Sequence, residues 1–334
     1  MAPTTLTDIY NPLVFNAAVD EAAAESNVFI NSGVLVENPT ISAMASVGGN
    51  IGELPFHSPL DTDGEPDYTN DDPDEFSAPD KIGTAKMVYR LASMHKSWST
   101  MTLARELALL DPLTAITNKI GGWWATQRQK RVIASADGII ASDVADTSEL
   151  TLSIYDDAAT PDAATIISAE AALDAMQTAG DKATMFEVVA MHSVTYNNLN
   201  KQNLIDFIPN AQGIVNFPTY LGKLVVVDDS LTVTAGTNSA QYTTLFFRRG
   251  AFDFGKGVVL LPSEPDRIPG AGNGGGQDVI HTRASDIIHP YGYAFTSDTV
   301  AGQSATIAEL KLAANWTRVV SRKNVGFAAL LHNN

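Results

Sequence analysis

The sequence predicts an α+β protein that combines a compact α/β unit and one long helix with segments too extended to bury themselves. Three observations predict this fold class: a proline-rich acidic stretch at 53–80, an apolar stripe at helical spacing after Pro112, and alternating helix and strand patterns over 165–265. The chain has 334 residues, of which 45% are hydrophobic and 18% charged. This length favours about two domains, and this composition excludes a disordered chain.

Net charge and cysteine content exclude several classes of protein. A net charge of −17 argues against a dedicated nucleic-acid binder, which normally presents a basic face to phosphates, but not against a wall that merely encloses DNA. The absence of Cys excludes disulfides and thiolate metal sites. No apolar run approaches the roughly 18 residues of a membrane helix, and the first residues lack the features of a signal peptide. We therefore expect no membrane partner.

Residues 1–50 are expected to form an N-terminal arm. Their apolar clusters, at Leu13–Phe15 and Val28–Ile30, are short and are separated by the alanine-rich segment EAAAES. Clusters of this size are too scattered to form a core alone, so we expect them to pack on other parts of the chain or on other subunits.

The next segment, 53–80, is predicted to be a long protruding loop. It contains ten carboxylates, five prolines and no Lys or Arg. Proline weakens helices and strand pairing, and dense like charge extends a chain. A strand is expected to return from this loop at 86–91.

The sign of the charge reverses directly after the acidic loop. Residues 81–131 hold nine Lys and Arg against two carboxylates, a net charge of +7 after −10. A solvated loop beside an unrelated basic surface is one interpretation; the other is that the loop of one subunit lies over the basic region of the next, since complementary charge sets register and partner choice. The candidate contacts in that second interpretation are Asp71, Asp72, Asp74 and Glu75 on the loop, with Arg128, Lys130 and Arg131 as partners.

The long helix is predicted to start at Asp111-Pro112, because Asp is a good N-cap and Pro suits the first helical position. Apolar residues then recur every three or four positions from Leu113 to Trp124, and the stripe resumes at Val132, which gives a helix of roughly 25 to 30 residues. Gly121-Gly122 interrupts the stripe. We interpret the pair as a bend, with a close packing contact as the alternative.

Residues 165–265 are predicted to form a separate α/β unit with a central sheet covered by helices. The tail, 286–334, contains strand-like patterns around one short helix, and is expected to rejoin the unit of the long helix. The predicted helices are 166–176, 192–203 and 305–315, and the predicted strands are 185–191, 223–227, 242–247, 287–295 and 316–331.

No motif predicts a catalytic, cofactor or metal site. The segment GAGNGGG at 270–276 lacks the Lys-Ser or Lys-Thr of a phosphate-binding loop, and is interpreted as a flexible surface loop or hinge. His281 and His289 with Asp278 have no metal-ligand spacing, and the acidic cluster at 71–75 lacks the glycine and terminal Glu of a calcium loop. Signatures of serine hydrolases and zinc peptidases are absent. The chain is therefore not expected to be an enzyme.

The order of these parts resembles the tailed-phage major capsid proteins of the Hong-Kong-97-type fold. The ordered series of local segments supports the resemblance over about residues 50–330: DPLTAITNKIGGWWATQRQKRVIASADGIIA, AMHSVTYNNLNKQNLID, YLGKLVVVDDSL, FFRRGAFDFGKG, PGAGNGGGQDVIHTR and ANWTRVVSRKNVGFAAL. The resemblance implies four parts, namely an N-terminal arm at 1–50, an extended E-loop region at 51–97, a peripheral domain with the spine helix at 98–155 and 281–334, and an axial α/β domain at 156–280.

The resemblance also implies a function and partners. The chain would be a structural protein that self-assembles into hexamers and pentamers of an icosahedral head around double-stranded DNA, without sequence-specific DNA binding. Its partners would be other copies of itself, scaffold and portal proteins and, in shells that carry one, a decoration protein, with assembly in the host bacterial cytoplasm and a final place in the virion. No residue-level match carries over the Lys–Asn cross-link of some relatives. Two alternatives remain open: an encapsulin-like compartment with the same fold, and a soluble hydrolase.

Overall fold

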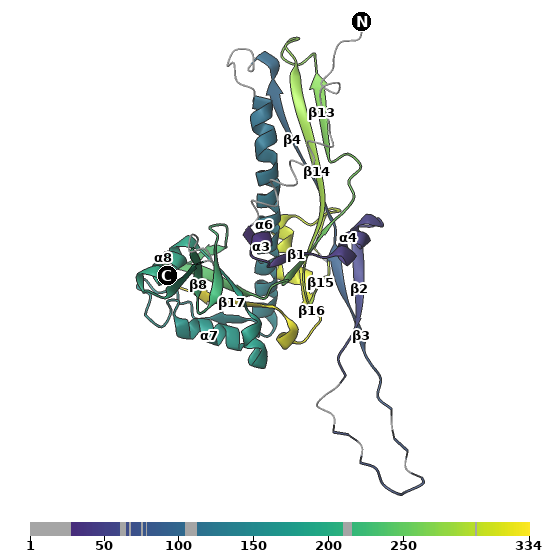
Figure 1. Cartoon of the computed structure of the whole chain (residues 1–334), viewed down its shortest axis with the longest axis vertical. Coiled ribbons are helices and arrows are strands. Elements are labelled where there is room, and N and C mark those ends of the chain that lie inside the picture. Colours follow the sequence, from purple (N-terminus) through teal and green to yellow (C-terminus); the bar gives the residue numbers. More distant parts are fainter. Residues whose placement is uncertain are drawn as a thin grey trace.

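The chain is elongated, with a long helix and sheet along its axis, an α/β unit to one side and a drawn-out loop at one end (Figure 1). The computed structural model describes residues 28–60, 65–66, 68–74, 76–77, 79–103, 112–209, 216–297 and 299–334. The predicted cluster at Leu13–Phe15, the N-cap Asp111 and the loop residue Glu75 lie outside the described residues. Across the described part, no helix is long and apolar enough to cross a membrane.

Helix α6, Pro112–Asp146, is the axis of the molecule. Its 35 residues make it about 52 Å long at ~1.5 Å per residue, longer than predicted. The predicted length would end the helix near Gly138, but the helix continues through that residue. A β-carbon at Gly138 would overlap the Leu310 carbonyl and the Trp316 indole, so the glycine makes room for the tail to cross the helix.

A five-stranded sheet packs along α6. Its strand order is β1-β12-β14-β13, and β4 pairs with the other side of β14 over ten residues. Between sheet and helix lies a small apolar cluster of Ile120, Trp124 and Ile280, and the Trp124 indole donates to the Thr282 hydroxyl (3.2 Å). The strands are β1 Leu35–Glu37, β4 Ala92–Met101, β12 Phe252–Lys256, β13 Ser263–Ile268 and β14 Gln277–Pro290.

The acidic segment connects the two strands of a hairpin. Strands β2 (Ile51–His57) and β3 (Thr84–Arg90) pair antiparallel, and the second confirms the predicted returning strand. The described residues of 58–83 contain no helix or strand, and Figure 1 shows this stretch extending well beyond the rest of the chain. Before the hairpin, helix α4 (Pro39–Ser46) is capped by the Asn38 side chain and packs on β12.

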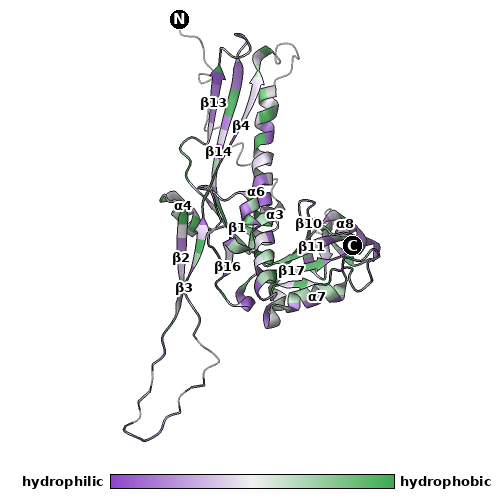
Figure 2. Ribbon diagram, turned by 180° about the vertical axis from the view of Figure 1, so that it is seen from behind, coloured by the Kyte–Doolittle hydropathy of each residue, from purple (hydrophilic) through white to green (hydrophobic). Residues whose placement is uncertain are grey.

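The α/β unit is built on an eight-stranded sheet in the order β5-β17-β11-β6-β9-β8-β7, with β10 beside β11. In Figure 2 most of these strands are drawn in hydrophobic green, whereas β13 is largely hydrophilic purple. Helix α7 (Ala169–Gln177) starts later than predicted because Ser168 caps it, and α8 is Ser193–Lys201. The strands are β5 Thr151–Ser153, β6 Val188–Met191, β7 Ile205–Pro209, β8 Asn216–Tyr220, β9 Lys223–Val227, β10 Val233–Ala235, β11 Ala240–Phe247 and β17 Phe327–His332.

The tail divides between the two units, contrary to the prediction that it rejoins the long helix as a whole. Its first elements do pack near α6, but β17 lies between β5 and β11 in the sheet of the α/β unit. Five of its six residues, Phe327–Leu330 and His332, are fully buried or nearly so, which fits a strand in the middle of a sheet. The elements near α6 are β15 Tyr293–Phe295, α9 Ile307–Leu310, the 3-10 turn Ala313–Asn315 and β16 Trp316–Arg318.

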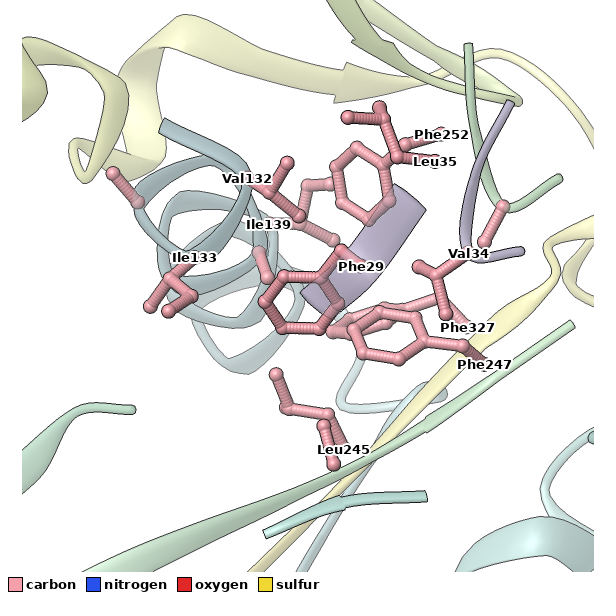
Figure 3. Close-up of a cluster of buried hydrophobic side chains, with 14 of the residues drawn as sticks. Phe29, Val34, Leu35, Val132, Ile133, Ile139, Leu245, Phe247, Phe252 and Phe327 are labelled. Atoms are coloured by element: carbon pink, nitrogen blue, oxygen red, sulfur yellow. The ribbon is translucent and has the colours of Figure 1, made fainter. Parts of the chain in front are cut away.

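The main core lies where α6, the α/β sheet and the arm meet (Figure 3). Phe29, from the short helix α3 (Val28–Asn31), is fully buried and packs edge-on against Phe247 of β11 (ring centroids 6.1 Å apart). Val132 and Ile139 of α6 face the same cluster. The predicted apolar cluster at 28–30 therefore packs, through Phe29, on other parts of its own chain.

Candidate assembly surfaces

Three of the predicted acidic contact residues lie together on the exposed loop. Asp71, Asp72 and Asp74 are all exposed. Their backbone is held by local turns, in which the Asp72 N–H donates to the Asn70 side chain (3.1 Å) and the Asp74 N–H to the Asp72 carboxylate (3.0 Å). These carboxylates face solvent in a single copy and are free to meet a neighbour.

Arg128 is not available as their partner, because it is buried and paired within its own chain. Its guanidinium donates to the Asp286 carboxylate at 2.9 Å and lies 5.4 Å from the centre of the Phe254 ring. Both Arg128 and Asp286 are buried. Position 128 lies on the face of α6 that packs on β14, so the charge stabilises the subunit and does not reach a neighbour.

Arg131 is likewise removed from the predicted contact. It is buried, and its guanidinium donates to the Ala305 carbonyl (2.9 Å). Burial lowers the pKa of Arg131, and the nearby negative charge of Asp286 partly opposes that shift. Lys130, between the two arginines, is exposed on the opposite face of α6 and stays a candidate contact.

Helix α6 passes through Gly121-Gly122 without interruption. A β-carbon at Gly122 would meet nothing within 4 Å, so no close contact inside the described chain requires glycine at that position. The packing alternative therefore loses its support at Gly122, and the bend at Gly121 and Gly122 stays a prediction about other states of the chain.

The loop between β12 and β13 exposes apolar side chains, a feature that its sequence does not predict. Leu260 is 95% exposed and Val258 70%. The loop is fixed to β14 at both ends, because the Gly257 N–H donates to the Ser285 carbonyl (2.7 Å) and the Arg283 N–H to the Pro262 carbonyl (2.8 Å). The run GVVLLP between two strands has the composition of a buried segment, which is why composition alone did not reveal its exposure.

A second apolar surface lies at the base of the β2–β3 hairpin. There, Met44, Val47, Tyr89, Leu91 and Ile287 are among the residues that line a groove of about 220 Å³. Val47 is 86% exposed. Exposed apolar patches of this kind mark contact sites more often than chance.

The segments considered for ligands do not form a chemical site. The glycine-rich 270–276 is the turn between β13 and β14, where Gly272, Asn273, Gly274 and Gly276 have positive φ. Asp278 is buried beside Arg267 (3.4 Å), and His289 is buried on the other face of β14. Among the described residues, no group of three or more His, Asp or Glu side chains converges as metal ligands.

Comparison with known proteins agrees with this architecture. No family model matches the sequence. The chain is 32% identical over 335 residues to the major capsid protein of Bacillus phage SPP1, with 99% of both chains covered. Among solved structures, it is similar to the capsid of Ralstonia phage GP4 (TM-score 0.59, 10% identity, 90% of this chain and 88% of that chain) and to the capsid of cyanophage Pam1 (TM-score 0.59, 9% identity, 93% of both chains).

The full-length relative and the shared fold support a structural capsid role and do not favour the encapsulin-like compartment or the hydrolase. The extended loop, the long helix and the α/β unit correspond to an α+β fold of the Hong-Kong-97 type. The chain thus self-assembles into capsid shells and has its place in the virion: it belongs to the major capsid proteins of tailed phages.

Proposed function

We propose that copies of this chain form the hexamers and pentamers of an icosahedral head around double-stranded DNA, and that the acidic loop of each copy lies on its neighbour. One observation supports the loop contact: the described part of 58–83 protrudes without helix or strand and exposes apolar side chains. Phe76 is 86% exposed and Tyr68 78%. Such side chains gain about 25 cal/mol per Å² when another surface covers them.

We propose revised domain boundaries that follow the strand pairing. The arm (1–50) and the E-loop region (51–97) keep their predicted limits. The axial domain loses β12 to β14, since these strands belong to the sheet that packs along α6, and gains β5 and β17. The peripheral domain then comprises α6, β12 to β14 and the tail as far as the start of β17, and β1 of the arm and β4 complete its sheet.

The partners in this proposal are other copies, a scaffold, a portal and a possible decoration protein, with assembly in the host bacterial cytoplasm. The net charge of −17 suits a wall that encloses DNA without gripping it. A shell wall needs no catalytic group, and we propose none. In electrostatic contacts between copies, individual exposed ion pairs contribute only about 0.2–1 kcal/mol, so they act through their repetition over the shell.

Deletion of residues 61–75 tests the proposed loop contact. The subunit should keep its fold, because none of the described residues in that range is in a helix or strand, while shell yield should fall. Circular dichroism measures the fold, and sedimentation with electron microscopy measures the shells. Unimpaired shells of equal stability would reject the contact.

Charge is tested separately by changing Asp71, Asp72 and Asp74 to Asn. Raised salt and this triple variant should both weaken assembly, because salt screens exposed charges beyond ~10 Å at 0.1 M. Glu170→Gln with Asp174→Asn, two exposed carboxylates of the α/β unit, is the control for a change in net charge. Lys130→Glu reverses the charge of the exposed candidate partner on α6. If the loop variant and the lysine variant both assemble as well as the unaltered chain, these charges face solvent and make no contact between copies.

A further inference from the structure

Two histidines on neighbouring strands of the peripheral sheet form a pair that the sequence did not reveal. His95 on β4 and His281 on β14 stack with ring centroids 5.6 Å apart and an interplanar angle of 23°. In the sequence, the carboxylate and the histidine nearest to His281 are Asp278 and His289. The strand register instead places it beside His95, because Ser97 is directly opposite His281 and His95 is opposite Arg283.

One nitrogen of each histidine and the Ser97 hydroxyl lie close together. His95 Nε2 lies 3.4 Å from His281 Nδ1, and the Ser97 Oγ lies 3.0 Å from the first and 2.9 Å from the second. Two nitrogens bound to one tetrahedral metal ion at ~2.1 Å are separated by about 3.4 Å. The spacing of the two ring nitrogens therefore already matches a shared ion, and the serine hydroxyl lies beside it.

The histidine pair is accessible to solvent, and the neighbouring cations are directed away from it. His95 is exposed and His281 half-buried, on the face of the sheet opposite to α6. Arg283 is opposite His95 in the strand register, and its guanidinium donates to the Glu264 carboxylate (2.9 Å) and to the Leu261 carbonyl (3.0 Å). Lys96 alternates to the other face of β4, so it does not oppose a bound ion.

We propose that His95 and His281, with Ser97 beside them, form a binding site for one borderline divalent transition-metal ion such as Zn²⁺, Ni²⁺ or Cu²⁺. Imidazole nitrogen suits these ions, whereas Mg²⁺ and Ca²⁺ prefer oxygen ligands. Water completes the coordination, since the described residues supply no third His, Asp or Glu there. A bound ion ties β4 to β14 in the middle of their ten-residue ladder and so stiffens the peripheral sheet.

Calorimetric titration of the purified full-length chain with ZnCl₂ or NiCl₂, in a buffer that does not chelate metals, tests the site. One ion should bind per chain, and MgCl₂ should give no binding heat. His95→Ala and His281→Ala should each weaken binding by more than about tenfold, since even loss of a residue that only orients a ligand costs 10–100-fold. His57→Ala removes an exposed histidine of β2 and should bind as the unaltered chain does.

Two further measurements separate a lost ligand from a damaged fold. Ser97→Ala should keep the binding, because both ring nitrogens remain. With Cu²⁺ bound, the electron paramagnetic resonance spectrum should show coupling to two nitrogens, and to only one in His95→Gln or His281→Gln. These Gln variants also take the place of an Ala variant that fails to fold. The proposal is overturned if no saturable binding occurs up to millimolar Zn²⁺, or if both histidine variants bind like the unaltered chain.

Discussion

Acid should destabilise the folded chain through two histidines that are buried as neutral rings. His332 is fully buried in β17, where its Nε2 contacts the Thr244 hydroxyl (2.9 Å) and its Nδ1 contacts the Asn333 carbonyl (2.6 Å). Because a carbonyl only accepts, Nδ1 carries the proton and Nε2 accepts from Thr244. His289 is also buried, and its Nε2 has no hydrogen-bond partner among the residues that the structure describes. Burial lowers the pKa of each ring to about 4, against an ordinary 6.5.

The sign of the effect follows from which state binds the proton first. Between pH 6.5 and 4 the unfolded chain protonates these histidines and the folded chain does not, so stability falls as the pH falls through that window. With a pKa of about 4 folded and 6.5 unfolded, each ring loses roughly 2 kcal/mol between pH 7 and pH 5. The two together lose about 4 kcal/mol, a large part of the 5–15 kcal/mol that holds a typical domain.

Urea unfolding of unassembled subunits, followed by tryptophan fluorescence, measures this loss at pH 7, 6 and 5. The double variant His289→Gln with His332→Gln should be less stable at pH 7 but nearly flat between pH 7 and pH 5. His57→Ala, which removes an exposed histidine, should keep the slope of the unaltered chain. An unaltered chain with equal stability at pH 7 and pH 5, or a double variant with the same slope, would refute the reasoning.

Two predictions concern α6. Gly138→Ala should lower the free energy of unfolding by about 1–3 kcal/mol or prevent folding, because the added carbon overlaps the tail. Gly122→Ala should raise it by up to ~1 kcal/mol, since nothing lies within 4 Å of the added carbon. Thermal unfolding of both variants measures the difference, and equal effects would contradict the prediction. Arg128→Ala should cost about 3–5 kcal/mol because it leaves Asp286 buried without its partner, while Lys130→Ala on the exposed face should change stability by less than ~0.5 kcal/mol in urea unfolding.

Local patterns predicted the elements that have strong local signals. The strand at 223–227 has the predicted bounds, and α6 begins its described part at the predicted Pro112. Its far end was missed, since Gly138 usually marks a terminus and only the crossing tail explains it. Similarly, nothing local in 316–331 distinguishes a strand that rejoins α6 from one that enters the middle of another sheet, because that choice depends on contacts far apart in the chain.

The candidate contacts show the same limit. Charge counting identified an acidic loop that is indeed exposed at Asp71, Asp72 and Asp74, yet it treated Arg128, Lys130 and Arg131 as one basic surface. Helical geometry places Lys130, two positions after Arg128, on the opposite face, whereas Arg128 and Arg131, three positions apart, share the buried face. The partner of Arg128 lies 158 residues away in sequence. The His95–His281 pair was missed for a related reason, because strand register cannot be inferred from spacing.

The position of β17 has a consequence for synthesis. All strands of the sheet along α6 have been synthesised once residue 290 has left the ribosome. Strand β11, in contrast, pairs with β17 (Phe327–His332), which begins about 80 residues after β11 ends. Until then one edge of β11 has no partner. A nascent chain, or one truncated before β17, therefore has a complete five-stranded sheet along α6, while the sheet of the α/β unit still lacks the strand that joins β5 to β11.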